Sequence, residues 1–384
     1  MPMPAPHEHV SCELLITNAC NLCCGYCIAE GLPGPAMTGE VGRKALDMFT
    51  FLGEGATSLE VTFTGGEPLL EFSLLEELTE YANERALKAG MQVTVVLKTN
   101  GTILTQAILA FMRGSCSKVV VSIDGNCTSH DAYRKNRAGN GTHRAVRQNL
   151  LTLLHNNVPC AVSVTVHPRF SGRVLDNVRY LHELGVRQID VGPAYGTVFW
   201  DEADILALTD SLEQVACYMR QANASGAALE IGPLYRESEH VGGVLADCWG
   251  CRAASTNLAY LPNGQISGCS ALAMLTSRFP EVVLGDVTTG LDDAAVTRLL
   301  RLAQAGADDR RACKGCKASP NCTGGCLAIN YSTNGAPLTP PAFYCRTIAK
   351  IPMAWHQAWA GLVPAARHAP RRSGSEVESD NDRP

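Results

Sequence analysis

Short runs rich in β-branched residues recur through the first half of the chain, and most are separated by stretches with helical spacing of apolar residues. The predicted strands are Glu13–Thr17, Leu59–Phe63, Gln92–Lys98, Lys118–Ile123, Ala161–Val166 and Arg187–Val191. One helical stretch covers Leu74–Ala82, and Gly90 ends it before the next strand. Because alternating strands and helices favour a parallel sheet, six such units predict an α/β fold with an open, partial (β/α)6, TIM-like barrel.

The composition changes after a helical segment expected from Asp201 to Ala224. Beyond it the chain is rich in cysteine, glycine and turn-forming residues and has few long periodic runs. From Pro364 onward it has almost no apolar content, which is typical of disorder. The sequence therefore predicts a barrel over residues 11–227, a small cysteine-rich domain over residues 228–350 and a disordered tail over residues 364–384.

Charge and hydropathy exclude two classes of partner. The net charge is −5 and the chain has no run of basic residues, so we expect no nucleic acid. The N-terminus lacks a basic region followed by an apolar run, and no later segment offers about 18 uninterrupted apolar residues. We therefore expect a cytoplasmic protein with no membrane partner.

Seventeen cysteines are unusual, and in a reducing compartment clustered cysteines favour metal binding or catalysis over structural disulfides. Cys20, Cys24 and Cys27 directly follow the first predicted strand, at the edge where parallel α/β folds place their chemistry. Three thiolates on a four-iron cluster leave one iron open to bind a substrate. A four-cysteine cluster or a closed zinc site normally only transfers electrons or holds the chain together.

The C-x3-C-x2-C spacing, with Tyr26 just before the last cysteine, resembles the radical S-adenosylmethionine (SAM) superfamily. The resemblance implies that Cys20, Cys24 and Cys27 hold a [4Fe–4S] cluster. It also implies that the open iron of this cluster chelates the amino and carboxylate groups of SAM.

A second motif, Thr64–Pro68, follows the second strand. Taken alone, this Gly-Gly-Glu-Pro sequence is equally consistent with a tight turn. After the cysteine motif, it resembles the segment that holds the methionine amino group of SAM in the family. The candidates are Gly65, Gly66, Glu67 and Pro68, because glycines allow a ligand close to the main chain and Glu67 can accept from an ammonium group.

The ends of the third to sixth strands supply further candidates. The block from Ser122 to Arg134 resembles the peptide-modifying branch of the family, which implies that these two residues hold the SAM carboxylate. A guanidinium suits a carboxylate because it donates two parallel hydrogen bonds, although a surface salt bridge is the alternative for Arg134. Asn100 is expected to reach the sugar or the cluster, unless its Asn-Gly sequence is only a turn. The resemblance also suggests that Ser163 faces the ribose and Val191 packs against adenine; no catalytic acid or base is identified.

The cysteines of the second half resemble the SPASM domain appended to many radical SAM enzymes. The matching residues are Cys251, Gly264, Cys269, Cys313, Cys316, Cys322, Cys326 and Cys345. The resemblance implies two auxiliary [4Fe–4S] clusters, which makes three clusters in all. One takes Cys313, Cys316, Cys322 and Cys345, and the other takes Cys251, Cys269, Cys326 and, as its fourth ligand, Cys248. Full ligation leaves neither auxiliary cluster an open iron, so both are expected to move electrons.

Two other readings of these cysteines remain. Zinc ribbons also use C-x2-C pairs, since such pairs suit tetrahedral zinc as well as iron. A c-type haem fits less well, because no C-x2-C here is followed by histidine.

The resemblance implies an enzyme that cleaves SAM to a 5′-deoxyadenosyl radical and oxidises or cross-links a side chain of a peptide or protein. Its expected partners are that substrate and an electron donor such as flavodoxin or ferredoxin. Because the first strand is expected to start near Glu13, which leaves no room before it for a recognition domain, a leader peptide would need either a separate leader-peptide recognition protein or direct contact with the barrel. The alternatives are anaerobic sulfatase maturation and a non-catalytic iron–sulfur or zinc scaffold. Ser270 weighs against sulfatase maturation, since that family carries an aspartate base after the cysteine matched by Cys269.

Overall fold

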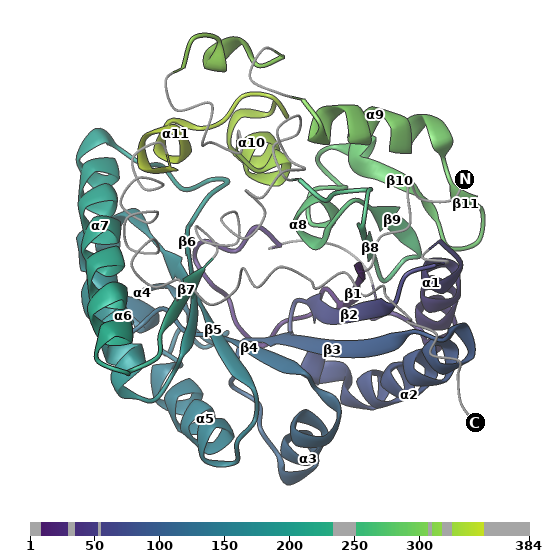
Figure 1. Cartoon of the computed structure of the whole chain (residues 1–384), viewed down its shortest axis with the longest axis horizontal. Helices are drawn as coiled ribbons and strands as arrows, with labels where there is room; N and C mark the ends of the chain where they lie inside the picture. The colour runs from purple at the N-terminus through teal and green to yellow at the C-terminus, as the bar shows by residue number, and fades with distance from the viewer. Residues whose placement is uncertain are drawn as a thin grey trace, which may run out of the picture.

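The computed structural model describes residues 9–29, 35–52, 55–232, 251–305, 309–316 and 325–348. Seven parallel strands hydrogen-bond in chain order along one curved sheet (Figure 1). They are β1 (His9–Thr17), β2 (Ser58–Gly65), β3 (Gln92–Thr99), β4 (Lys118–Ser122), β5 (Cys160–Val166), β6 (Gln188–Pro193) and β7 (Glu230–Gly232). The first six confirm the predicted strands and the α/β barrel. The seventh is only three residues long and carries no periodic signal.

Helices cover the outer face of this sheet (Figure 1). They are α1 (Gly39–Leu52), α2 (Phe72–Ala89), α3 (Gln106–Ser115), α4 (Cys127–Tyr133), α5 (His143–His155), α6 (Val174–Glu183) and α7 (Glu202–Ala224), with 3-10 turns η1 (Pro68–Glu71) and η2 (Pro168–Arg173). Helix α7 starts where Asp201 accepts from the Asp204 N–H, and α2 ends at Gly90 in the left-handed conformation. Both boundaries confirm the sequence prediction.

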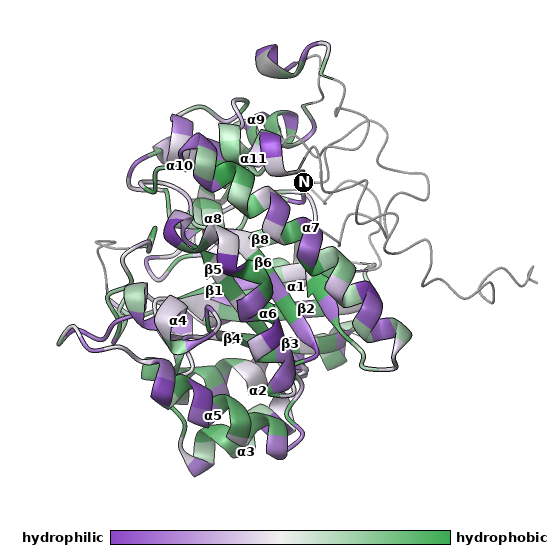
Figure 2. Ribbon diagram, turned by 90° about the vertical axis from the view of Figure 1, so that its left-hand side faces the viewer, coloured by the Kyte–Doolittle hydropathy of each residue, from purple (hydrophilic) through white to green (hydrophobic). Residues whose placement is uncertain are grey.

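The two faces of the sheet differ in character. On β5, Val162, Val164 and Val166 pack into the large core beneath the helices, whereas Ser163 and Thr165 point to the opposite, inner face. Figure 2 shows hydrophilic and hydrophobic stretches alternating along the outer helices α5 and α7, as expected for helices with one face on this core. Among the described residues, the apolar clusters of the inner face are small: one is Val96, Val120 and Ala161, and the other is Leu15, Ala259, Leu261 and Ala273. Polar side chains therefore line the inside of the barrel.

The cysteine-rich half extends the same sheet at its other edge. Strand β8 (Asn257–Tyr260) pairs in parallel with β1, and β9 (Gln265–Ser267), β10 (Val283–Asp286) and β11 (Gly290–Leu291) continue outward as antiparallel neighbours. The helices here are α8 (Ser270–Ala273), α9 (Asp293–Ala303), α10 (Leu327–Asn334) and α11 (Ala342–Ile348), with 3-10 turns η4 (Pro280–Val282) and η5 (Arg311–Cys313). This brings the segment from Thr256 to Ser270, which includes Cys269, beside β1. Among the described helices, none has the length and apolar character needed to cross a membrane.

Candidate functional site

The loop that follows β1 carries Cys20, Cys24 and Cys27, and its backbone is held by the segment after α4. The N–H of Cys23 donates to Lys135 O at 2.8 Å, and the N–H of Gly25 donates to Tyr133 O at 3.0 Å. The Arg137 guanidinium donates to Cys20 O from Nε at 3.0 Å and from Nη2 at 2.9 Å. These contacts fix the path of the cysteine loop.

The three thiols of this loop lie near one another. Burial raises the pKa of Cys24 to about 11, Arg134 opposes this rise, and the neighbouring Cys27 and Cys20 add to it. Among the described residues, no three histidine, cysteine or acidic side chains converge tightly enough to hold a single metal ion. The thiolates of a four-iron cluster bind different irons, so their sulfurs stay further apart than the ligands of one ion.

Two glycines at the end of β2 let this loop approach the sheet. Gly66 N donates to Thr17 O at 2.7 Å, and a Cβ on Gly66 would lie 2.1 Å from the carbonyl oxygen of Ala19. Gly65 has a φ of +126°, a conformation that other residues rarely adopt. The close neighbours of the two glycines are thus backbone atoms: the end of β1 for Gly65 and the start of the cysteine loop for Gly66. Pro68, the last residue of the motif, begins η1.

The carboxylate of Glu67 is fully buried and serves as a junction between strand ends. Its Oε1 accepts from Leu69 N at 3.0 Å and from Thr99 Oγ1 at 2.9 Å, and its Oε2 accepts from Asn100 N at 2.6 Å. Burial raises the pKa of Glu67, although these hydrogen bonds oppose the rise. The residue expected to accept from SAM therefore also holds the end of β3 against the end of β2.

Asn100 reaches the cysteine loop from the end of β3. Its Nδ2 donates to Cys20 Sγ at 3.7 Å and to Asn21 Oδ1 at 2.8 Å, and its Oδ1 accepts from Thr102 N at 3.0 Å. Of the two expected targets, the sugar and the cluster, the structure places Asn100 beside Cys20, one of the expected cluster ligands.

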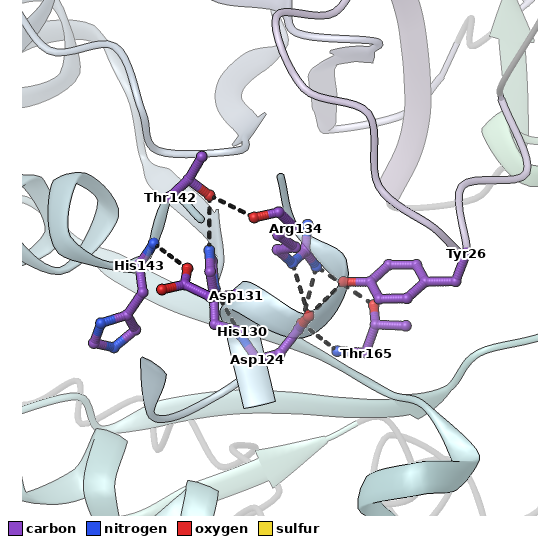
Figure 3. Close-up of polar contacts among 8 residues, drawn as sticks. All are labelled: Tyr26, Asp124, His130, Asp131, Arg134, Thr142, His143 and Thr165. Atoms are coloured by element: carbon purple, nitrogen blue, oxygen red, sulfur yellow. Dashed lines mark hydrogen bonds and ion pairs between the residues drawn. The ribbon is translucent and has the colours of Figure 1, made fainter. Parts of the chain in front are cut away.

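Asp124, just beyond β4, is the centre of a buried polar network (Figure 3). Arg134 donates to it twice, from Nε to Oδ2 and from Nη2 to Oδ1, each at 3.0 Å. The Tyr26 hydroxyl donates to Asp124 Oδ2, and Thr165 N donates to Oδ1 at 2.9 Å. Burial disfavours the charge of Arg134, but Asp124 and Tyr26 outweigh this and raise its pKa. The partner of Arg134 is therefore a buried carboxylate that the sequence analysis did not include.

His130 holds the backbone of Asp124 directly and that of Arg134 through Thr142 (Figure 3). Its Nδ1 accepts from Asp124 N at 3.3 Å, so its Nε2 carries the proton and donates to Thr142 Oγ1 at 3.0 Å. Thr142 in turn donates to Arg134 O at 3.1 Å. Burial lowers the pKa of His130 to about 3, and the positive Arg134 adds to this effect. A neutral imidazole thus fixes the backbone on both sides of the Asp124–Arg134 pair.

The remaining barrel candidates divide between the two faces of the sheet. Ser122 and Ser163 are paired across β4 and β5 and share the inner face. Val191 pairs with Val164 in the core that faces the helices and is 3% exposed. The structure therefore brings the two serines together and does not bring Val191 to them.

A second group of thiols, Cys251, Cys269 and Cys326, lies near Glu13 on the inner face of β1. Burial raises the pKa of Cys269, and the neighbouring Cys326, Glu13 and Cys251 add to this effect. Burial also raises the pKa of Cys313, with a contribution from the nearby Cys316. Cys345 lies on α11. The two remaining expected ligands, Cys248 and Cys322, lie outside the described residues.

Tyr195, in the loop after β6, was not singled out in the sequence. Burial raises its pKa, and the next contributions come from Cys326, Cys269 and Cys27. The neighbouring Gly196 donates through its N–H to Thr333 Oγ1 on α10 at 3.4 Å. Tyr195 therefore stands between the first cysteine loop and the second group of thiols. Only the fold brings these three segments together.

Comparison with known proteins agrees with this arrangement. Residues 14–173 match the family profile described as the Radical SAM superfamily. An uncharacterized protein of Methanocaldococcus jannaschii is 29% identical over 176 residues, which span 46% of this chain and 59% of that protein. The serine-type anaerobic sulfatase-maturating enzyme of Klebsiella aerogenes is 24% identical over 333 residues, which cover 83% of this chain and 80% of the enzyme.

Two solved structures share the fold. Native anSMEcpe with bound AdoMet and Cp18Cys peptide superposes with a TM-score of 0.76 at 19% identity, covering 92% of this chain and 99% of that one. Streptococcus suis SuiB bound to precursor peptide SuiA has a TM-score of 0.62 at 16% identity, covering 87% and 75%. Residues 14–173 of this chain therefore form a radical SAM domain.

Proposed function

We propose that this enzyme is a maturase that oxidatively modifies or cross-links a side chain of a ribosomally made peptide. The observation that carries the proposal is the position of Tyr195, whose neighbours are Cys27 of the first loop and Cys269 and Cys326 of the second group. A substrate held there lies close to both cysteine groups. An electron removed from it then has a short path to an acceptor, which favours oxidation over simple cleavage.

In the barrel, Cys20, Cys24 and Cys27 would hold a [4Fe–4S] cluster with one open iron for SAM. When bound, this pair supplies a 5′-deoxyadenosyl radical that abstracts hydrogen from an unreactive carbon. Gly65–Pro68, Ser122, Ser163 and Arg134 would bind the SAM molecule around it. Tyr26 supports this site by bonding to Asp124, the partner of Arg134.

Two auxiliary [4Fe–4S] clusters would bring the total to three. Their proposed ligands are Cys313, Cys316, Cys322 and Cys345 for one, and Cys248, Cys251, Cys269 and Cys326 for the other. The proximity of Cys269 to Cys326 and Cys251, and of Cys313 to Cys316, supports this division.

A peptide substrate is supported by the two solved structures of similar fold that carry peptides. The polar inner face of the barrel suits a peptide, because its backbone groups need hydrogen-bond partners when they leave water. An electron donor such as flavodoxin or ferredoxin and a leader-peptide recognition protein complete the proposed set of partners.

Formation of formylglycine on a sulfatase is a second candidate, and one contact favours it. Ser270 stands where that family has an aspartate base, yet the Glu13 carboxylate accepts a hydrogen bond from Ser270 N at 2.5 Å. A carboxylate from β1 is therefore present beside position 270. The curated relative from Klebsiella aerogenes is itself a sulfatase-maturating enzyme.

The test is anaerobic reconstitution with iron and sulfide, followed by dithionite and SAM. We expect about twelve irons per chain and release of 5′-deoxyadenosine. Bound zinc without deoxyadenosine would return the chain to the scaffold reading. Mass spectrometry of a sulfatase-derived peptide and of peptides encoded near the gene then separates the two maturase candidates, since only the true substrate changes mass.

A further inference from the structure

The inner face of β1 presents a carboxylate to the cysteine-rich half of the chain. Glu13 Oε2 accepts from Ser270 N at 2.5 Å and from Asn257 Nδ2 at 3.4 Å, and Oε1 accepts from Lys98 Nζ at 3.3 Å. Its side chain is only 12% exposed, whereas that of Lys98 is 42% exposed. One carboxylate therefore connects β1, β3, β8 and the first residue of α8.

This carboxylate is ionised and close to a proposed cluster ligand. Burial disfavours the charge of Glu13, but Lys98 and the Ser270 N–H outweigh burial and lower its pKa. Cys269 precedes Ser270, and Glu13 is among the charges that act on its thiol. A negative charge thus sits beside the second cysteine group in a site with little water.

We propose that Glu13 is a positioning residue for Cys269, and that its fixed negative charge lowers the reduction potential of the cluster held by Cys251, Cys269 and Cys326. The inference rests on the proposed function, because it requires that auxiliary cluster. It assigns a role in the auxiliary site to a residue of β1, the first strand of the barrel.

The physical basis is electrostatic. Reduction adds one negative charge to a cluster, and a nearby carboxylate opposes that addition most strongly where the dielectric is low. Lys98 offsets part of this charge, but it is more exposed and bonds to the other carboxylate oxygen. Glu13 is the more buried of the two groups, so the net electrostatic effect at Cys269 is that of its negative charge. A lowered potential keeps the cluster able to pass an accepted electron onward.

The experiment is an EPR-monitored redox titration of the reconstituted full chain and its Glu13→Gln variant. Glutamine keeps the shape and an acceptor oxygen for Ser270 N, but it removes the charge. We expect the midpoint potential of one auxiliary cluster to move to a more positive value. The SAM-dependent change in the spectrum of the first cluster should persist. The matched control is Glu60→Gln, which alters an exposed carboxylate on the inner face of β2 that accepts a hydrogen bond from Thr62 Oγ1 at 3.3 Å.

A Glu13→Ala variant tests the positioning role separately. It also removes the acceptor for Ser270 N, so we expect a broadened auxiliary signal or lost iron beyond the potential shift. Unchanged auxiliary potentials in Glu13→Gln, with all clusters present, would overturn this inference and leave the proposed function intact. An equal shift in Glu60→Gln would also overturn it. A wild-type protein with no auxiliary cluster signal would overturn both.

Discussion

Asp124 is the residue on which the proposed SAM site depends most. Its two oxygens accept from Arg134, Tyr26 and the backbone of Thr165, and its side chain is almost wholly buried. Arg134 is equally enclosed, so neither charge has water as an alternative partner. A buried pair of this kind is costly to break from one side, because the remaining charge stays behind unpaired.

Replacement of Asp124 by Asn should therefore lower the free energy of unfolding by about 3–5 kcal/mol. Urea denaturation monitored by circular dichroism measures this change, and SAM binding by calorimetry should weaken with it. Glu40→Gln, at an exposed ion pair with Lys44, is the control and should leave the denaturation midpoint unchanged. If the denaturation midpoint of Asp124→Asn is also unchanged, the prediction is wrong and Arg134 has another partner in the variant.

His130 gives the β4–α4 region a pH dependence of known sign. Its pKa is lowered in the folded protein, mainly by burial, with the positive Arg134 and His143 acting in the same direction and Asp131 against them. Between about pH 3 and pH 6.5, His130 therefore binds a proton in the unfolded state but not in the native state. The stability contributed by neutral His130 is complete above its unfolded pKa of about 6.5 and is lost as the pH falls toward 3.

We expect the wild type to lose about 2 kcal/mol more than His130→Gln between pH 7 and pH 5. Glutamine cannot accept that proton, and other titrating groups cancel in the difference. Urea midpoints across this range provide the measurement. Parallel curves for the two proteins would mean that His130 is protonated in the native state.

At the scale of elements, the cysteine loop is seated on the ends of β2 and α4. Gly66 N and Glu67 N donate to carbonyls of Thr17 and Ala19, and the segment from Tyr133 to Arg137 supports the other side. The loop is therefore shaped by backbone contacts that require two glycines. A side chain at position 66 would have to displace the carbonyl of Ala19.

Gly66→Ala should accordingly reduce iron retained by the first cysteine set and suppress 5′-deoxyadenosine formation. Auxiliary iron should remain, because its proposed ligands lie elsewhere in the sheet. The control is Gly114→Ala in α3, where a Cβ would meet no atom within 4 Å and alanine favours the helix. Normal iron and SAM cleavage in Gly66→Ala would show that the loop can shift without cost.

For the whole molecule, the essential feature is that one continuous sheet brings two groups of cysteines together. Tyr195 has Cys27 of the first loop and Cys269 and Cys326 of the second group as neighbours. Strand β8 pairs with β1, so residues 251–269 lie beside the strand that leads to Cys20. The two groups can then be disabled independently. This gives each a separate experimental signature.

Cys24→Ala should abolish SAM cleavage and leave about eight irons per chain, while Cys316→Ala should permit some cleavage but block formation of the peptide product. Iron analysis and mass spectrometry of both products measure the two effects. Cleavage that continues in Cys24→Ala, or full product from Cys316→Ala, would remove the altered group from the mechanism.

Sequence patterns predicted the local parts of this molecule well. Six strands and the boundaries of α7 followed from β-branched runs, helical spacing and caps, which depend on near neighbours. Contacts between distant segments could not be read this way. The bond between Glu13 and Ser270 joins residues 257 apart, and Asp124 gains its role only when Tyr26 and Arg134 fold around it. Alternation left the direction of Val191 open until the register with Val164 settled it.

The pairing of β1 with β8 also has a consequence for biosynthesis. Strand β1 pairs along its second edge with β8, whose first residue, Asn257, is made 246 residues after its partner Ser11. At about 5–20 residues per second, that edge stays unpaired for roughly 10–50 seconds. During this interval the nascent chain exposes an unpaired edge of an apolar strand, which can pair with strands of other chains and aggregate. We therefore expect yield in a heterologous host to rise when chaperones are co-expressed and to fall when translation is slowed, because slower synthesis lengthens this interval.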